Sequence, residues 1–494
     1  MSWRSEHDDE QLPSGWMRVA IADIANIHSG QTPSGIKEHI QPNGDIPWFK
    51  VGDMNRDGNE RFMDNGENFL TNEAADSLRM RVFPPYTLIF PKRGGAIATN
   101  KKRMLRQPAC LDLNVMALVL PEESASYIWW WFQTINLAKL SDGSNVPQIN
   151  NRHIAPLEVP VAPLPEQKRI VSKIEELFSD LDAGVSALER ARANLRRYRA
   201  SVLKSAVEGR LTETWRKANQ ANPDIEPASE LLARILRERR HRWEQQQLAT
   251  YESKGKKPPK NWQSKYKEPV APDTASLPEL PNGWCWATLK QICLIDVGYA
   301  FKSKKFVDEG MRLLRGENLE PGSFRWKNTK YWSLDDVEDY RHLLVNAGEI
   351  ILAMDRPLVS AGLKIARAKE SDTPCLLVQR MARFRFIEPA MTGFVYSACQ
   401  TREFIKHLVG NQTGTQLPHI SGKGIESFVF PLPPIEEQSE IEDEVARQSS
   451  IIDDIERQLE RDHRRSETLR QCILKSAFEG KLCETESLEL ADAS

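Results

Sequence analysis

The stretch Leu203-Lys204-Ser205-Ala206-Val207-Glu208-Gly209 recurs 271 residues later as Leu474-Lys475-Ser476-Ala477-Phe478-Glu479-Gly480. The same offset aligns residues 143–213 with residues 414–484 without a gap, and 23 of the 71 aligned pairs are identical. A further match lies upstream, where Pro281-Asn282-Gly283-Trp284 repeats Pro13-Ser14-Gly15-Trp16. Each repeat is therefore about 200 residues long, which indicates a duplicated pair of domains rather than a solenoid of short repeats.

A long helix is predicted at the end of each repeat. Prolines and an acid in Pro163-Leu164-Pro165-Glu166 are typical of a helix start, and Gly209 is typical of a helix end. Apolar residues in between alternate spacings of four and three, which indicates a coiled-coil seam. We expect the two seams to pair within the chain, antiparallel if a pseudo-twofold axis relates the repeats. Packing of each helix on its own globular domain is the alternative. The predicted seam positions are Ile170, Ile174, Leu177, Leu181, Leu188, Leu195, Ile441, Val445, Ile452, Ile455, Leu459 and Ile473.

The middles of the repeats, residues 35–140 and 303–410, share little identity. They share a rhythm of short buried strands, expected at residues 86–91, 113–120, 349–354 and 376–387. The fold class is therefore α+β, with two mixed α/β globular domains separated by two long antiparallel helices. A shared pattern of strands with divergent sequences suggests that the two domains perform the same function on two different targets. The predicted segments are a globular domain at 1–158, a helical region at 159–213, a basic helical connector at 214–280, a second globular domain at 281–430, a second helical region at 431–484 and a tail at 485–494.

A connector rich in lysine and arginine joins the two repeats. Residues 215–270 contain 13 Lys or Arg and 7 Asp or Glu, and one amphipathic helix is expected around residues 228–251. The stretch Lys254-Gly255-Lys256-Lys257-Pro258-Pro259-Lys260 follows it. This segment is either a solvated connector or a surface that docks a partner or contacts phosphates.

Composition places the 494-residue chain among globular proteins. It is 40% apolar and 28% charged, with a net charge of −2, and no apolar run approaches the ~20 residues that a membrane span needs. The N-terminus is polar and acidic, so we expect no secretory signal and a cytoplasmic protein. Seven scattered cysteines form no C-x-x-C, which argues against a disulfide framework and against a zinc site. The near-neutral balance argues against a protein that coats nucleic acid indiscriminately.

Two short motifs imitate catalytic sites. Phe83-Pro84-Pro85-Tyr86 is similar to an amino-methyltransferase loop, but Phe83 cannot accept a hydrogen bond from the amine to be methylated. Pro223-Asp224 with Glu252-Ser253-Lys254 has the letters of a PD…ExK nuclease, but it lies in charged helix and linker rather than on adjacent strands. The phosphate-binding G-x-x-x-x-G-K-[ST], the zinc-binding H-E-x-x-H and the G-x-S-x-G elbow are absent from the sequence. We therefore expect no catalytic residue and no metal site in this chain.

Clustered basic residues make DNA the expected ligand of the globular domains. Residues 77–111 contain eight Lys or Arg and no acid, and Lys92-Arg93-Gly94-Gly95 directly follows an expected strand. Such clusters neutralise phosphates, and arginine can also read guanine in the major groove. For any single residue, a solvated surface remains the alternative. The candidate DNA contacts are Lys92, Arg93, Lys101, Lys102, Arg103, Lys302, Lys304, Lys305, Arg356 and Lys364.

The paired signatures resemble those of the specificity subunit of a type I restriction-modification system. The resemblance rests on the Pro-x-Gly-Trp openings, on Gly143…Pro147-x-Ile149 with Gly414…Pro418-x-Ile420, and on the matching helix starts and ends. It covers nearly the whole chain, residues 13–484.

This resemblance implies a non-catalytic protein with two variable target-recognition domains, each reading one half of a bipartite site in double-stranded DNA. It implies that the helical regions form the spacer and that the chain binds no cofactor itself. Its expected partners are two adenine-N6 methyltransferase subunits, which use S-adenosylmethionine, and restriction subunits, which use ATP and Mg²⁺. Because the two middles differ, the site should be asymmetric. The competing interpretations are a nuclease or methyltransferase in its own right, and a coiled-coil scaffold that does not bind DNA.

Overall fold

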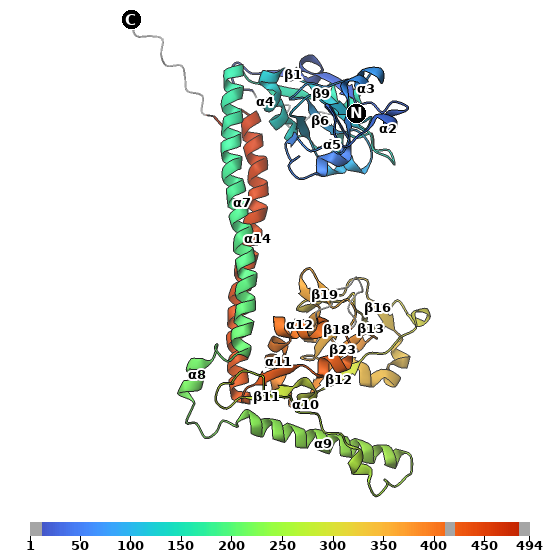
Figure 1. Ribbon diagram of the computed structural model, residues 1–494, viewed down its shortest axis with the longest axis vertical. Coiled ribbons are helices and arrows are strands. Elements are labelled where there is room, and N and C mark those ends of the chain that lie inside the picture. The colour runs from blue at the N-terminus through green and yellow to red at the C-terminus, as the bar shows by residue number, and fades with distance from the viewer. Residues whose placement is uncertain (1–11, 411–419, 484–494) are drawn as a thin grey trace. The chain divides into compact units, whose positions relative to one another are not determined.

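The computed structural model describes residues 12–410 and 420–483, which divide into two units (Figure 1). Unit 1 comprises the chain up to residue 190 together with the segment from residue 459 onward, and unit 2 comprises residues 191–458. The repeat positions Gly414 and Pro418, together with residues 1–11 and 484–494, lie outside the described residues.

Both units contain an antiparallel sheet with the same strand order. In unit 1 the order is β2-β9-β6-β7, extended by the parallel strand β4, and in unit 2 it is β12-β23-β18-β21. Every residue of the inner strands β6 and β18 is buried, which explains why these strands are apolar runs rather than alternating patterns. The bounds are β2 Asn26–Ser29, β4 Phe62–Met63, β6 Leu88–Pro91, β7 Arg103–Leu105, β9 Val115–Val119, β12 Cys293–Val297, β18 Ile350–Ala353, β21 Ile365–Arg367 and β23 Met381–Phe386.

A second, smaller sheet also recurs. Strand β3 pairs parallel with β8 and antiparallel with β5 in unit 1, and β13 pairs parallel with β22 and antiparallel with β16 in unit 2. A two-stranded ribbon then joins the start of each domain to its end, as β1-β10 and β11-β24. The bounds are β1 Met17–Ala20, β3 Ile46–Phe49, β5 Phe69–Leu70, β8 Cys110–Leu111, β10 Glu158–Val161, β11 Cys285–Thr288, β13 Met311–Leu314, β16 Lys330–Trp332, β17 Leu344–Val345, β22 Cys375–Leu377 and β24 Val429–Leu432. The fold is therefore duplicated even where the sequence is not.

In unit 1, helix α4 (Glu122–Gln133) fills the space between the main sheet and the long helices. Its aromatic run, residues 127–132, is buried throughout. Phe132 packs against Phe90 of β6 at 5.1 Å between ring centroids, and Trp130 packs edge-on against Phe178 at 4.8 Å. The run is thus the link between the domain core and the helices.

The two long helices are α7 (Leu164–Val207) and α14 (Ile435–Phe478), of 44 residues each, and their bounds are 271 residues apart. Helix α7 starts in unit 1 and ends in unit 2, whereas α14 starts in unit 2 and ends in unit 1. The helices therefore run in opposite directions, and they lie side by side (Figure 1). Within unit 2 they are joined by Arg199, which reaches Asp453 at 2.5 Å and Glu456 at 3.3 Å. The predicted antiparallel intramolecular pair is confirmed.

Burial varies along the predicted seam. Ile170 and Ile174 are buried in the core that also contains α4, and Ile441 is buried in the core of unit 2, so the helix ends pack on the globular domains as well. Away from the ends, a two-helix seam covers its residues less completely. Ile452 is buried and Ile455 is 42% exposed; the half-buried positions are Leu177, Leu181, Leu188, Leu195, Val445, Leu459 and Ile473.

Each long helix stops against the opening residues of a globular domain. Gly480, with φ +73°, abuts Pro13 in unit 1, and Gly209, with φ +71°, abuts Pro281 in unit 2. Glycine is required at both positions because the left-handed conformation disfavours other residues and a Cβ atom would overlap the proline ring. The repeated Glu-Gly ending therefore lets the C-terminal end of each long helix pack against the first residues of a globular domain.

The remaining helices are short, except in the connector. Helix α9 (Ala228–Ser253) forms an arm of unit 2, preceded by α8 (Glu213–Ala218). The others are α1 Ile21–Ile24, α2 Ile36–His39, α3 Asn72–Ser77, α5 Leu137–Leu140, α6 Asn151–Ile154, α10 Leu289–Ile292, α11 Thr392–Ala398, α12 Arg402–Val409 and α13 Gly422–Glu426. Across the described ranges, no helix is both long enough and apolar enough to span a bilayer.

Candidate DNA interface

In unit 1 the candidate residues gather at one end of the main sheet. Strands β2 and β6 end there and β9 begins there, so Ser29, Lys92 and Asn114 are neighbours. The backbone N–H of Lys92 donates to the carbonyl of Asn114 at 2.7 Å, and the Lys92 ammonium donates to Ser29 Oγ at 2.9 Å. Lys92 is half-buried and lies beside neutral partners, so its charge remains available to an anion at this edge.

The repeated Pro-x-Ile motif holds the loop after β6 in place. Gly94 donates its N–H to the carbonyl of Pro147 at 2.8 Å, and Ile149 donates to the carbonyl of Lys92 at 2.9 Å. Arg93, between these two attachments, is exposed. The motif therefore presents the arginine from a backbone that is fixed on both sides.

Unit 2 repeats this arrangement with different side chains. Met354 takes the place of Lys92: its N–H donates to the carbonyl of Arg380 at 2.8 Å, and its carbonyl accepts from Ile420 at 2.9 Å. Asp355 and Arg356 follow, with Asp355 paired to the Arg380 guanidinium. Arg356 is exposed and has a φ of +45°. Two exposed arginines, Arg93 and Arg356, thus lie on equivalent loops.

The lysines after β12 share this edge in unit 2. Lys302, Lys304 and Lys305 are exposed; Lys302 immediately precedes the 3-10 turn η4 (Ser303–Lys305), which contains the other two. The turn rests on an aromatic cluster in which Phe301 packs against Trp332 at 4.9 Å, and the Lys305 ammonium lies 5.8 Å from the Trp332 ring. Rigid aromatic support beneath three cations favours contact with a polyanion.

The prediction is wrong for Lys102. This side chain is 1% exposed, and its ammonium donates to the carbonyl of Ile135 at 2.6 Å and faces the ring of Phe132. Burial lowers its pKa to about 7. A side chain enclosed in this way cannot reach a phosphate, and a charge count cannot reveal it because neighbouring residues of an extended chain point to opposite sides.

Three other candidates are tethered rather than free. The Lys101 ammonium donates to Asn55 Oδ1, and the Lys364 ammonium donates to the carbonyl of Gly316. Arg103 is half-buried and donates to the carbonyls of Lys102 and Met54 at 2.8 and 3.1 Å. Burial is the first cause of a lowered pKa for both Arg103 and Lys364. Arg93, Arg356 and the three lysines in and just before η4 are the better-exposed members of the set.

Sequence reasoning missed a glycine that both interfaces share. Gly30 follows β2 and Gly298 follows β12, and a Cβ atom on either residue would overlap a carbonyl of the neighbouring strand. The next residues, Gln31 and Tyr299, occupy equivalent positions, because their N–H groups donate to the carbonyls of Leu111 and Leu377. Both side chains are exposed. The signal was available: the 268-residue offset that aligns Trp16 with Trp284 also aligns these residues.

Neither of the two short motifs that resemble catalytic motifs forms an active site. Phe83 is buried, so its loop offers no acceptor for an amine. Asp224 precedes α9 and Glu252 lies in its last turn, so a helix of 26 residues, about 39 Å at 1.5 Å per residue, separates the two carboxylates. Among the described residues, no group of three or more His, Cys, Asp or Glu side chains could hold a metal ion.

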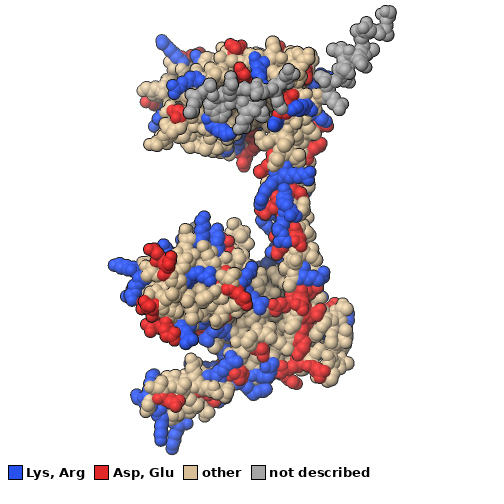
Figure 2. Space-filling model, turned by 180° about the vertical axis from the view of Figure 1, so that it is seen from behind, with Lys and Arg blue, Asp and Glu red and all other residues tan. Residues whose placement is uncertain are grey.

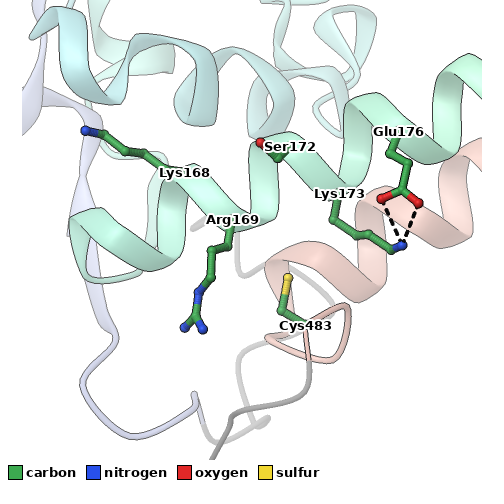
Figure 3. A pocket seen from close by; sticks show the side chains of 6 residues that line it. All are labelled: Lys168, Arg169, Ser172, Lys173, Glu176 and Cys483. Atoms are coloured by element: carbon green, nitrogen blue, oxygen red, sulfur yellow. Dashed lines mark hydrogen bonds and ion pairs between the residues drawn. The ribbon is translucent and has the colours of Figure 1, made fainter.

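A shallow hollow lies beside the start of α7 (Figure 3). It is lined by Lys168, Arg169, Ser172, Lys173, Glu176 and Cys483. Glu176 is engaged by the Lys173 ammonium at 3.0 Å, and burial raises the pKa of the Cys483 thiol. The lining contains no histidine that could activate the thiol or the serine, so the hollow has no catalytic arrangement.

Residues 13–190 and 281–462 each match the family model described as the type I restriction modification DNA specificity domain. The chain belongs to this family. It is 33% identical over 275 residues to the type I restriction enzyme EcoAI specificity subunit of Escherichia coli, an alignment that covers 55% of this chain and 42% of that protein. It is 22% identical over 447 residues to the MjaVIII specificity subunit of Methanocaldococcus jannaschii, covering 90% and 88% of the two chains.

Solved structures share the fold. A chain from a study of complex assembly and conformational transition of the type I restriction-modification system matches with a TM-score of 0.63 and 14% identity, over 95% of this chain and 99% of that one. The HsdS subunit from Thermoanaerobacter tengcongensis matches with a TM-score of 0.50 and 14% identity, over 96% and 99%. Membership of this family makes the chain a specificity subunit, and not an enzyme in its own right.

Proposed function

We propose that this specificity subunit reads an asymmetric, bipartite site in double-stranded DNA, one half with each unit. The observation that carries the proposal is the pair of equivalent sheet edges. Both edges share the glycine, the anchored loop and an exposed arginine, whereas the side chains between them differ, as in Gln31 and Tyr299. A constant frame with variable side chains suits the reading of two different half-sites.

The chemistry of the edges fits DNA. Arg93 and Arg356 can each donate two parallel hydrogen bonds to a guanine, whereas the lysines of η4 and Lys92 neutralise phosphates and so fix the register. Loss of one bidentate base contact typically costs ~1–3 kcal/mol of discrimination. The arginines therefore carry sequence information and the lysines mainly carry affinity.

The paired helices are the proposed spacer. A continuous pair of 44-residue helices, held by buried ends and by the Arg199 ion pairs, is a stiff element. Domains that read the same face of a duplex require half-sites about one turn apart, ~10 bp from centre to centre. We expect the motif to contain unread base pairs of constant number between its halves.

The same helices are the proposed docking surface for two adenine-N6 methyltransferase subunits, which supply S-adenosylmethionine chemistry, and with them restriction subunits that use ATP and Mg²⁺. Tyr198, Ile451, Ile455 and Leu469 are 40–49% exposed on these helices. We expect the partner subunits to cover these exposed apolar side chains. The complex would act in the cytoplasm, on chromosomal and invading DNA.

Single-molecule sequencing of N6-methyladenine tests this function. A host without methylation would express the chain together with its methyltransferase subunit, and the control would omit the chain. We expect one bipartite asymmetric motif that appears only when the chain is present. Methylation that is independent of the chain, or a single continuous motif, would contradict the proposal.

A further inference from the structure

The connector of unit 2 is a built arm rather than a loose linker. Helix α9 is rooted in the core of the unit, where Ala228, Leu231 and Ile235 are at most 1% exposed. Polar contacts continue the attachment: Arg239 donates to the carbonyl of Cys293 at 2.9 Å, and Arg242 donates to the carbonyl of Ile387 at 3.3 Å. The first half of the arm is therefore fixed to the domain that carries the second DNA interface.

The returning chain is held against the outer half of α9. Trp262, in the 3-10 turn η3 (Trp262–Lys265), stacks on Trp243 with 5.9 Å between ring centroids and 20° between planes. Tyr266 packs on the same Trp243 ring at 5.2 Å and lies under the Arg240 guanidinium at 5.9 Å. An aromatic clamp of this kind gives the tip, residues 254–267, a defined place.

The charges of the arm are segregated between its root and its tip. At the root, Arg234 is paired with Glu226 at 2.9 Å and with Glu388 at 3.2 Å, and Arg242 is paired with Glu238 at 2.6 Å. The tip holds six lysines and no acid, and all six are exposed: Lys254, Lys256, Lys257, Lys260, Lys265 and Lys267. The nearest acid before the tip is Glu252. The nearest acid after it, Glu268, forms an ion pair with Arg240 at 3.8 Å. Within the described chain, none of the six lysines has an ion-pair partner.

We propose that this lysine tip binds the phosphate backbone of duplex DNA outside the half-site read by unit 2. Six unneutralised charges held together repel one another, and a polyanion relieves that repulsion. Lysine is a flexible point charge without the planar fork that reads bases, so the contact is independent of sequence. The placement next to a half-site rests on the proposed function, whereas the affinity of the tip for DNA does not.

The geometry of the arm suits a contact on flanking DNA. The arm leaves the base of the long helices and runs beneath the domain of unit 2, toward the same side as that domain (Figure 1). Basic side chains gather at its end in the space-filling view (Figure 2). A helix of 26 residues is about 39 Å long, close to one turn of DNA at ~34 Å. The arm is attached at Cys293, the first residue of β12, whereas the candidate base-reading edge lies at the other end of that strand, so a contact of the tip would fall outside the half-site.

The test replaces the six tip lysines with glutamine, and the matched control replaces them with arginine. Each full-length chain is assembled with its methyltransferase subunits, and its affinity for a 50-bp duplex of unrelated sequence is measured by fluorescence anisotropy across a salt series. We expect the glutamine variant to bind at least about tenfold more weakly at ~0.1 M salt, with the salt slope reduced by ~0.9 per lost contact. The arginine variant should match the wild type. Equal binding and equal slopes for wild type and glutamine variant would overturn the proposal.

A second measurement separates the partners and the two proposals. The glutamine variant could instead lose the methyltransferase subunits while its salt slope on DNA equals that of the wild type. In that case the tip binds an acidic protein surface, and the DNA assignment is wrong. On duplexes that carry the methylated motif, removal of the flank beyond the second half-site should weaken the wild type and leave the glutamine variant unaffected. A wild type that shows no preference for the motif would refute the proposed function. The measurement on unrelated DNA would still decide whether the tip binds DNA.

Discussion

Trp284 Nε1 donates a hydrogen bond to Glu437 Oε2 at 2.8 Å and so ties the opening of the second domain to the first turn of α14. Trp16 and Glu166 form the matching bond in unit 1, at 3.1 Å to the first turn of α7. The repeated Pro-x-Gly-Trp and Glu-Gln motifs are therefore the two sides of one joint. The joint sets how each domain is held on the helix that follows it in the sequence.

The joint is most extensive in unit 2, which makes Glu437 a stability determinant. This carboxylate is 1% exposed and also accepts from Thr212 Oγ1 at 2.7 Å and from Arg216 Nε at 2.9 Å. We expect Glu437→Ala to lower the free energy of unfolding of this unit by about 3 kcal/mol, because a mostly buried guanidinium loses its partner. Glu442→Ala is the control: its ion pair with Arg367 is about 40% exposed, so the loss should stay below ~1 kcal/mol. Urea denaturation followed by tryptophan fluorescence measures both, and equal losses would contradict this assignment.

Lys102 should make stability depend on pH. Its folded pKa of about 7 lies below the unfolded value of 10.5 because the ammonium is buried. Between these values the unfolded chain binds more protons, so the free energy of unfolding should rise with pH, by up to ~1.4 kcal/mol per pH unit. Lys102→Met should remove this rise between pH 7 and 9 and leave DNA affinity unchanged. Parallel stability curves for the two proteins would show that the ammonium is not desolvated, and weaker DNA binding would restore Lys102 as a contact.

Arg93 and Arg356 should act on different halves of the motif. They occupy equivalent exposed loops, one in each unit. We expect Arg93→Ala to relax the methylated sequence in one half only and Arg356→Ala in the other, each with a ~10- to 100-fold loss of discrimination at the affected base pair. Methylation of a randomised site library measures both variants. A uniform loss of binding without relaxed sequence would reassign these arginines to phosphate contacts.

Ile451 and Ile455 should be needed for assembly. They are 44% and 42% exposed and lie four residues apart on α14, hence on one face of the helix. We expect Ile451→Glu to abolish co-purification of the methyltransferase subunits without unfolding the chain, because this side chain lies outside the predicted seam and is 44% exposed. Ile455→Glu, at a seam position, should in addition weaken the pairing of the long helices. Arg457→Glu, at an exposed position of the same helix, serves as the control and should assemble normally. Retained assembly in the Ile451→Glu variant would exclude this face as the docking surface.

The long helices could be predicted closely because a 4-3 apolar spacing and terminal Pro and Gly signals are local features. The strands were expected near their true positions, with one difference: residues 376–387 form two strands, β22 and β23, because the chain turns at Arg380 with φ +65°. Apart from the glycine pair Gly30 and Gly298, which the 268-residue offset aligns, the equivalence of the two sheet edges could not be predicted, since the domain middles share little identity and the edges are assembled by long-range backbone hydrogen bonds. Charge alone also failed to separate buried Lys102 from its half-buried neighbour Lys101, because the direction of a side chain depends on local backbone geometry.

An exchange of domains tests whether each unit reads its own half-site. Residues 13–158 would be replaced by the matching domain of another specificity subunit, and N6-methyladenine would be sequenced in cells that express the hybrid with its methyltransferase subunit. We expect one half of the motif to change while the other half and the number of unread base pairs stay the same. A change in both halves, or in neither, would contradict this expectation.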